Sequence, residues 1–271
     1  MDFLQMDFMQ NALIAGIILS FLTGIISIFI ILRKLAFIGV GISHAAFGGV
    51  ALGIYLGINP TLSGIVFSIF VALAIGYVSK RGRIKEDTSI GIFFTSAMAL
   101  GVILIGISRQ YNVDVFGYLF GNILAISRSD IYIIAILGII VTAILITLSK
   151  ELLFISFDEE VAKVDGIPVN FLNYLFLVIL AITVVIGTKI IGLTLISALL
   201  IIPGATAIFL SAKFFKMVTI AITSSIISTI CGLMISYYLN VASGATIVLT
   251  ATAIFFLAFF YASITEKIQS H

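Results

Sequence analysis

The sequence predicts an all-α fold, a polytopic bundle of about nine transmembrane helices, and two observations support this. Of the 271 residues, 62% are hydrophobic and 10% are charged, whereas a soluble domain is roughly 45–50% apolar and about 25% charged. The apolar residues also gather in long uncharged runs, and a helix needs about 20 such residues to cross a bilayer. A water-soluble globule and a disordered chain are therefore excluded.

Nine uncharged runs are expected to span the membrane as helices. They are too long for barrel strands and lack the alternation of polar and apolar residues that a barrel requires. The predicted spans are residues 11–32, 35–57, 61–79, 88–107, 131–148, 171–187, 190–210, 217–239 and 245–262. Because the connections are short and the composition does not shift along the chain, residues 1–271 are predicted to form a single transmembrane domain.

The orientation follows from the basic residues, which are enriched in cytoplasmic loops. If the loop 80–87 lies in the cytoplasm, eleven of the fourteen Lys and Arg residues lie on that side. The three on the outer side are Arg109, Arg128 and Lys189. The N-terminus then lies outside and the C-terminus inside. The chain is expected to be a multi-pass protein of the cytoplasmic membrane, with lipid around its helices.

The sixth and seventh predicted spans allow an alternative topology. In it the chain has eight spans and one re-entrant segment instead of nine spans. The first of these two predicted spans is short, and the turn between them is predicted at Thr188-Lys189. Pro203 and Gly204 are expected to interrupt the second and to act as a hinge, and broken segments of this kind line cavities in transporters. The alternative would place three C-terminal lysines outside, so the charge distribution favours nine.

The composition also excludes several functions. No Asp or Glu lies within a predicted span, although ion-coupled transporters use intramembrane carboxylates. The zinc motif His-Glu-x-x-His and paired intramembrane acids are absent, so intramembrane proteolysis is not expected. The single Cys231 allows no disulfide and no cysteine-rich metal site, and a net charge of +2 provides no basic face for nucleic acid.

His44 is an ionisable side chain near the middle of the predicted span 35–57. Polar groups in hydrocarbon are costly and usually face an aqueous path, and imidazole binds divalent transition metals. His44 and its neighbour Ser43 are therefore candidates for a metal pathway. The alternative is a neutral packing histidine, with Ser43 bonded only to its own backbone.

Small residues recur every four positions on the same span, and we call them the small-residue stripe: Gly41, Ala45, Gly49, Gly53 and Gly57. Such a stripe lets another helix approach closely, so a helix-packing role is expected. His44 and Gly48 lie on the adjoining row of the same helix, beside the predicted contact.

A short helix is predicted at about 159–165, between the fifth and sixth spans. Asp158 is a good N-cap, and the acids Glu159 and Glu160 fall in the first turn, where the helix dipole favours them. Gly166 fits the position after the C-cap, and Pro168 prevents the helix from continuing. Its apolar members Val161, Ala162 and Val164 are expected to pack on the bundle or on another protein.

Five stretches together resemble the permease subunits of the metal-ion ABC importers, a family that carries zinc, manganese or iron. Each stretch alone is weak evidence for the family. Together they occur in the family's order and spacing, over residues from about 11 to 262. They are SHAAFGGVAL (43–52), LFGNIL (119–124), FDEEVAKVDG (157–166), GLTLISALLIIPGATA (192–207) and SGATIVL (243–249).

The resemblance implies an ATP-driven importer of a divalent metal ion in a prokaryotic cytoplasmic membrane. Two permease copies would form the path, two ATPase subunits would bind beneath, and an extracytoplasmic metal-binding protein would deliver the ion. The short helix matches the family's coupling helix, so Asp158, Glu159, Ala162 and Gly166 are expected to contact the ATPase. The chain is not expected to be an enzyme, because it has no nucleotide phosphate loop. The metal is expected as substrate, with no permanently bound cofactor.

Two positions depart from the family pattern. Many members carry an acid four residues before the motif histidine, where this chain has Val40. A two-ligand site of that type cannot form within one helix here, which leaves the choice among zinc, manganese and iron open. The last motif is often preceded by Pro, where this chain has Ala242. A stand-alone secondary transporter or channel for a small solute remains the alternative function.

Overall fold

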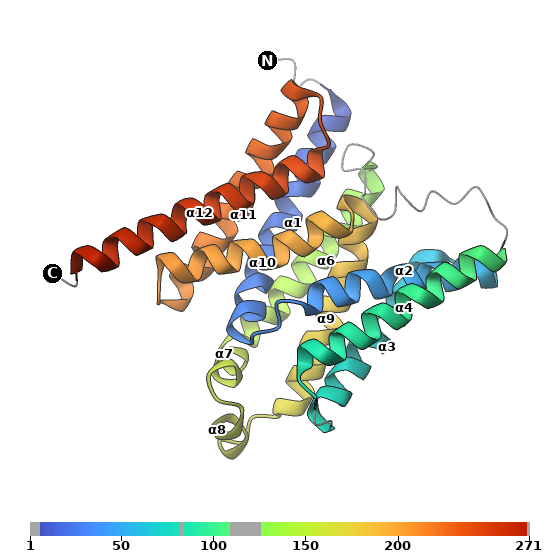
Figure 1. Cartoon of the computed structure of the whole chain (residues 1–271), viewed down its shortest axis with the longest axis horizontal. Coiled ribbons are helices and arrows are strands. Elements are labelled where there is room, and N and C mark those ends of the chain that lie inside the picture. Colours follow the sequence, from blue (N-terminus) through green and yellow to red (C-terminus); the bar gives the residue numbers. More distant parts are fainter. Residues whose placement is uncertain (1–5, 82–83, 109–125, 270–271) are drawn as a thin grey trace. The chain divides into compact units, whose positions relative to one another are not determined.

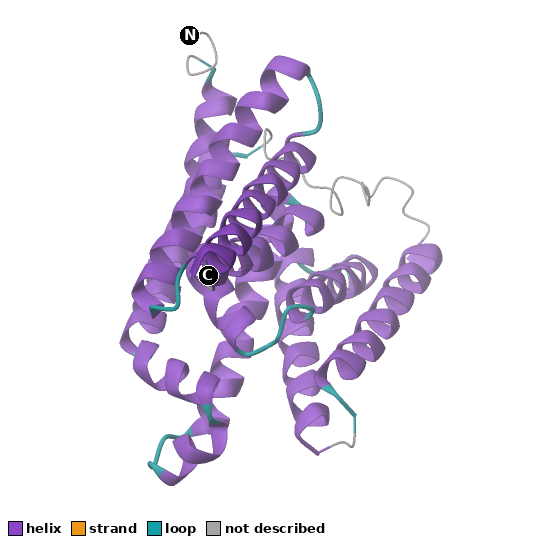
Figure 2. Cartoon of the chain, turned by 60° about the vertical axis from the view of Figure 1, so that its left-hand side comes forward, coloured by secondary structure: helices purple, strands orange, loops and turns teal. Residues whose placement is uncertain are grey.

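The computed structural model describes residues 6–81, 84–108 and 126–269, and this part of the chain is almost entirely helical. No strand occurs among these residues, and short loops join the helices (Figure 2). In chain order the helices, shown in Figure 1, are α1 (Asp7–Leu32), α2 (Ile38–Leu56), α3 (Pro60–Arg81), α4 (Glu86–Ser108), α6 (Arg128–Thr147), α7 (Ser149–Phe157), α8 (Glu159–Val164), α9 (Val169–Ile191), α10 (Leu193–Leu210), α11 (Phe214–Leu239) and α12 (Ser243–Gln269).

Within the described ranges, nine helices are long and apolar enough to cross a membrane, which confirms the predicted number. They are α1, α2, α3, α4, α6, α9, α10, α11 and α12. Large apolar side chains such as Phe70, Ile139 and Leu257 are exposed on them. A helix that is apolar on every side is typical of a membrane span, where lipid covers the outward-facing side chains.

The break between the sixth and seventh spans lies elsewhere than predicted. α9 continues through Thr188 and Lys189 to Ile191, and the chain turns at Gly192, whose backbone angles are φ 86° and ψ 165°. This region of backbone space is essentially restricted to glycine. The predicted turn at Thr188-Lys189 is therefore wrong, and Gly192 is the residue that separates the two helices.

The predicted interruption at Pro203 is also wrong, because α10 runs from Leu193 to Leu210 with Pro203 inside it. Gly204 lies against α1: a Cβ atom there would be 2.6 Å from the backbone oxygen of Ser27. Gly204 therefore allows two helices to approach closely. The hinge role of Pro203 and Gly204 stays a prediction.

The contacts group the helices into two compact units, whereas a single domain over 1–271 stays a prediction. The first unit contains α1, α6, α11, α12 and nearly all of α10. In it, α1 packs on α6 and α11, and α11 packs on α12. Small and hydroxylated residues permit the close contact of α1 with α11, where the hydroxyls of Ser20 and Thr229 are 2.7 Å apart.

The second unit contains α2, α3, α4, α7, α8 and α9. α2 packs against α3, α4 and α9, while α3 also packs against α9. α7 and α8 follow each other directly, and α8 also contacts α9. This unit therefore carries both His44 and the predicted short helix.

Candidate coupling helix and metal pathway

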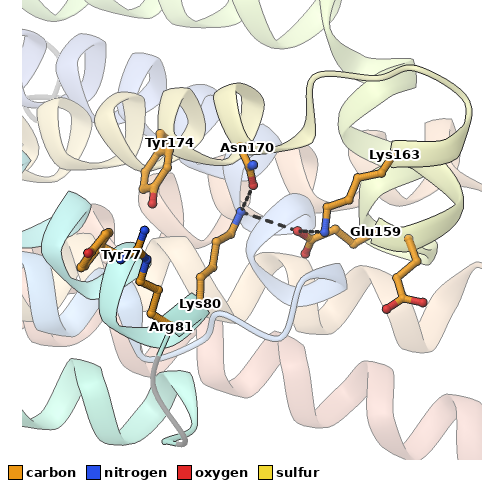
Figure 3. Close-up of a pocket in the computed structure, with 8 residues that line it drawn as sticks. Tyr77, Lys80, Arg81, Glu159, Lys163, Asn170 and Tyr174 are labelled. Carbon is orange, nitrogen blue, oxygen red and sulfur yellow. Dashed lines mark hydrogen bonds and ion pairs between the residues drawn. The ribbon is translucent and has the colours of Figure 1, made fainter.

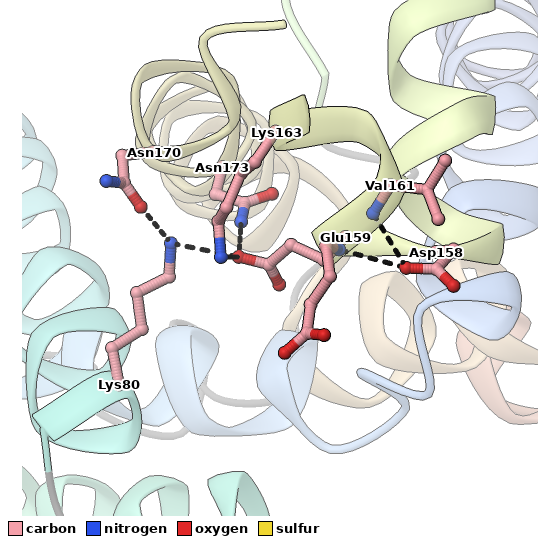
Figure 4. A network of polar contacts seen from close by, with 8 residues as sticks. Lys80, Asp158, Glu159, Val161, Lys163, Asn170 and Asn173 are labelled. Carbon is pink, nitrogen blue, oxygen red and sulfur yellow. Dashed lines mark hydrogen bonds and ion pairs between the residues drawn. The ribbon is translucent and has the colours of Figure 1, made fainter. Parts of the chain in front are cut away.

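Asp158 begins α8 as the sequence predicts. Its backbone is extended (φ −153°, ψ 108°), and its Oδ1 accepts hydrogen bonds from the backbone N–H groups of Glu160 at 2.9 Å and Val161 at 3.0 Å. Figure 4 shows both bonds. These are the second and third residues of the helix, whose N–H groups have no partner within it. The predicted N-cap is confirmed.

Gly166 ends α8 in the left-handed conformation, with φ 83°. Its N–H donates to the carbonyl of Lys163 at 3.2 Å, and the N–H of Ile167 donates to the carbonyl of Ala162 at 3.1 Å. This pair of bonds is the Schellman motif, which satisfies carbonyls at a helix C-terminus and favours glycine at the left-handed position. The predicted C-terminal signal is therefore confirmed, and this six-residue helix has a defined cap at each end.

The carboxylate of Glu159 attaches α8 to its surroundings. Its Oε1 lies 3.2 Å from Nζ of Lys163 on the same helix and 3.6 Å from Nζ of Lys80 on α3. The side-chain amide of Asn173 on α9 donates to the same oxygen at 3.5 Å. Lys80 Nζ also donates to Oδ1 of Asn170 on α9 at 2.8 Å (Figure 4). We call these five residues the polar network.

No local pattern in the sequence indicates that Lys80, Asn170 and Asn173 take part in this site. Lys80 was placed only in a basic cytoplasmic loop, and it lies 90 positions before Asn170 in the chain. The polar network arises because the end of α3 comes to lie beside α8 and the start of α9. A contact set by packing over such a separation leaves no local sequence pattern.

Four members of the network, all but Asn173, line a pocket of about 710 Å³ together with Glu160, Arg81 and two tyrosines. Figure 3 shows that the neighbouring cations Lys80 and Arg81 point to different partners. Lys80 extends toward Asn170 and Glu159, with its Nζ also 5.6 Å from the ring centre of Tyr174. Arg81 instead lies over Tyr77 of its own helix, 5.0 Å from the ring centre, within the range of a cation–π contact.

The apolar residues of α8 divide between two sides. Ala162 has no exposed surface, whereas Val161 is 50% and Val164 is 90% exposed. Phe157, which precedes the N-cap, is also exposed. Of the residues expected to contact an ATPase, Ala162 thus faces inward and Glu159 bonds within the unit. Val161 and Val164, which are expected to pack on the bundle or on another protein, form the outward apolar surface.

His44 lies on α2, partly buried, and its Nδ1 is 2.9 Å from the backbone oxygen of Val40. A carbonyl oxygen can only accept, so Nδ1 carries the proton in a neutral ring and Nε2 keeps its lone pair. The ring meets Phe94 of α4 edge to face, with the centres 4.6 Å apart. The hydroxyl of Ser43 donates to the same oxygen of Val40 at 2.9 Å, as the packing alternative expects.

The described residues contain no group of three or more His, Cys, Asp and Glu side chains placed to hold a metal ion. His44 therefore belongs to no such group. Its Nε2 is the atom available as a metal ligand, while the bond from Nδ1 to Val40 orients the ring.

The small-residue stripe contacts two different helices. A Cβ atom at Gly41 would lie 2.6 Å from Ile90 on α4, whereas one at Gly49 would lie 2.9 Å from the Cα of Gly64 on α3. At Gly53 it would lie 2.8 Å from the Cα of Pro60 on α3. A four-residue step rotates about 40° beyond one full turn of 3.6 residues, so the stripe winds from one neighbour to the other.

Gly57 does not belong to this packing surface. It is the C-cap of α2 with φ 68°, it is exposed, and no atom lies within 4 Å of a Cβ built there. Its predicted packing role is wrong, because it ends the helix in a left-handed conformation that favours glycine. On the adjoining row, a Cβ at Gly48 would be 2.5 Å from the backbone oxygen of Ala97 on α4.

The remaining family-like stretches have different positions. The stretch 119–124 lies outside the described residues, as do Arg109 and Asp114. The stretch 243–249 begins at the first residue of α12, as predicted, with Ala242 immediately before the helix. The stretch 192–207 begins at the Gly192 turn and continues along α10.

Comparison with known proteins identifies close relatives over almost the full length. The chain is 42% identical to the manganese transport system membrane protein MntC of Listeria monocytogenes over 96% of this chain and 92% of that protein. It is 40% identical to the manganese import system permease protein ScaB of Streptococcus parasanguinis, over 97% and 94%. Among solved structures, PsaBC from Streptococcus pneumoniae in complex with Fab matches with a TM-score of 0.85 and 41% identity, covering 95% of this chain and 93% of that chain.

The family model described as the ABC 3 transport family matches residues 5–262. This range contains the capped helix α8, the helix α2 with His44, and all nine apolar helices or most of each. The chain belongs to the ABC 3 transport family.

Proposed function

We propose that the chain is the membrane-spanning permease of an ATP-driven importer, and that its substrate is divalent manganese. The observation that carries the mechanism is α8, a short helix capped at both ends that presents Val161 and Val164 outward. The printed names of the relatives support manganese. The partners are an ABC-type ATPase, an extracytoplasmic metal-binding protein and a second copy of this permease.

α8 has the properties of a docking element. The Asp158 cap and the Gly166 turn limit its conformational freedom, so little order has to be gained on binding. Its exposed valines can enter an apolar groove, as amphipathic helices do in other complexes. Asp158, Glu159, Ala162 and Gly166 fix the shape and position of this surface, and direct contact with the ATPase falls mainly to Val161 and Val164.

Transport then follows from movement of this helix. When the ATPase binds and hydrolyses ATP, it displaces α8, and α9 begins only a few residues later at Val169. The membrane helices exchange a cavity open to the outside for one open to the cytoplasm. ATP energy drives the exchange only to the extent that the partners bind the two conformations with different affinity.

A weak binding site suits the ion path. His44 contributes one imidazole nitrogen, and the side chain at position 40 is Val. An ion held by few ligands can leave again, as conduction requires. Imidazole suits zinc and iron, whereas manganese prefers oxygen ligands, so manganese is favoured by the relatives and not by His44.

The proposed function is tested with the permease reconstituted in liposomes with its ATPase and binding protein. We expect uptake that requires ATP and is faster for Mn²⁺ than for Zn²⁺ or Fe²⁺. A preparation without ATP is the control. Equal uptake in the absence of the ATPase would instead show that the chain is a stand-alone secondary transporter or channel. Faster uptake of zinc or iron would overturn manganese as the proposed substrate.

Replacing His44 with Ala should slow Mn²⁺ uptake by about tenfold, the effect of losing roughly 1.4 kcal/mol of ion binding. The reason is the loss of the Nε2 ligand. The melting temperature in detergent is the control, because the edge-to-face contact with Phe94 contributes only about 0.5–1.5 kcal/mol. Normal uptake by H44A would show that His44 is a packing residue.

A further inference from the structure

Lys80 connects α8 to a helix that is distant from it in the chain. The residue is in the last turn of α3, and its Nζ contacts Glu159 of α8 at 3.6 Å and Asn170 of α9 at 2.8 Å. One side chain thus joins the end of α3 to both the short helix and the helix that follows it (Figure 4).

The carboxylate of Glu159, which pairs with Lys80, is held in position by other contacts. Glu159 also accepts from Asn173 at 3.5 Å and pairs with Lys163 at 3.2 Å. Because Glu159 is the first residue of α8, a displacement of the helix displaces this carboxylate. Lys80, held at the same time by Asn170, then transfers the displacement to the cytoplasmic end of α3.

α3 in turn packs closely on α2, and the nearest atoms are backbone atoms and the Cβ atoms of Phe67 and Ser63. At Gly49, a Cβ atom would lie 2.9 Å from the Cα of Gly64 and 3.1 Å from the backbone oxygen of Ser63. At Gly53, it would lie 2.8 Å from the Cα of Pro60. Contacts this close leave no space for one helix to shift sideways without the other.

We infer that Lys80 is a positioning residue that transmits the movement of α8 to α3 and, through the glycine contacts, to α2 and His44. The inference rests on the proposed function. It assigns Lys80 a role in coupling ATP hydrolysis to transport, and it assigns no role in binding the ATPase.

The small contribution of the Lys80–Glu159 ion pair to stability distinguishes a coupling role of Lys80 from a structural role. The Lys80 and Glu159 side chains are 33% and 40% exposed, and an ion pair this exposed contributes little to the free energy of unfolding because water screens it. Loss of Lys80 should therefore leave the fold and the ATPase complex intact. The quantity that changes is the number of ions transported per ATP hydrolysed.

The test compares Lys80→Met with Arg81→Met in the complex of permease, ATPase and binding protein. Methionine keeps much of the length of either side chain and removes the charge. The Arg81 variant is the matched control, because its guanidinium lies over Tyr77 rather than against α8. For K80M we expect normal co-purification of the ATPase, normal melting temperature, and Mn²⁺ transported per ATP lowered by about fivefold or more, in the range of typical coupling energies.

Lys80→Arg restores the positive charge and should raise the ratio above that of K80M. If K80M does not form a stable complex, Asn170→Ala is used, because it removes the second attachment of Lys80 and should lower the ratio in the same direction. A normal ratio in K80M, an equal loss in R81M, no recovery in K80R, or loss of ATPase binding in both K80M and N170A would overturn the inference. Failure of the unmodified chain to bind an ATPase would instead overturn the proposed function.

Discussion

Replacing Gly166 with Val should reduce ATP-dependent uptake by roughly five- to thirty-fold, which corresponds to 1–2 kcal/mol. Gly166 has φ 83° and ends α8 in the Schellman motif. The left-handed conformation costs a residue with a Cβ atom about 1–2 kcal/mol of conformational free energy. A β-branched side chain raises this cost. α8 is six residues long, so a strained end changes the orientation of Val161 and Val164.

Co-purification of the ATPase with the permease measures this effect directly, with uptake as the second readout. Gly57→Val is the matched control. Gly57 also has positive φ, at 68°, and neither glycine has an atom within 4 Å of a built Cβ. The two substitutions therefore impose similar backbone strain, but only one does so beside α8. If G166V binds and drives transport like the unmodified chain, α8 is not the coupling element.

Gly204→Ala is expected to lower the stability of the permease by about 1–3 kcal/mol, the usual cost of overfilling a packed contact. The added Cβ would lie 2.6 Å from the backbone oxygen and 2.8 Å from the backbone carbon of Ser27. A backbone group cannot rotate away as a side chain can, so α1 and α10 must separate. Thermal unfolding in detergent measures the loss.

The matched control is Gly106→Ala on α4, where nothing lies within 4 Å of a built Cβ. Removing an unneeded glycine from a helix stabilises by roughly 0.5–1 kcal/mol, so the two variants should move in opposite directions. An unchanged melting temperature in G204A, together with slower uptake, would favour the hinge predicted for Pro203 and Gly204 over close packing.

The local features of this fold were predictable from the sequence. Long uncharged runs predict spans because lipid offers no partner for backbone polar groups, so a helix must satisfy its own. The caps of α8 were predictable for the same local reason: Asp158 can accept from nearby N–H groups, and Gly166 tolerates positive φ. Each of these signals involves residues within a few positions of one another.

Two local features were nevertheless missed. α7 covers Ser149–Phe157, between the predicted span 131–148 and the predicted short helix, and its buried Leu152 and Ile155 recur at helical spacing. The turn at Gly192 was predicted three residues too early, at Thr188-Lys189. In both cases charged residues interrupt the apolar run, Lys150 and Glu151 in α7 and Lys189 in α9, and the helix continues through them.

The features that depend on packing were not predictable. Lys80 joins Glu159 only because α3 ends beside α8, and the basic loop around it had a sufficient explanation in membrane orientation. The inward position of Ala162 and the outward position of Val164 likewise depend on which side of α8 meets the rest of the unit. A helix of six residues is too short for periodicity to decide this.

Accessibility of α8 is measured most directly with Val164→Cys in a chain whose single native Cys231 has been replaced by Ala. Val164 is 90% exposed, so a membrane-impermeant maleimide can reach a cysteine there. Labelling is expected in inside-out vesicles and not in right-side-out vesicles, and bound ATPase should block it. Labelling from the outer side, or labelling that the ATPase leaves unchanged, would show that α8 does not couple this permease to ATP.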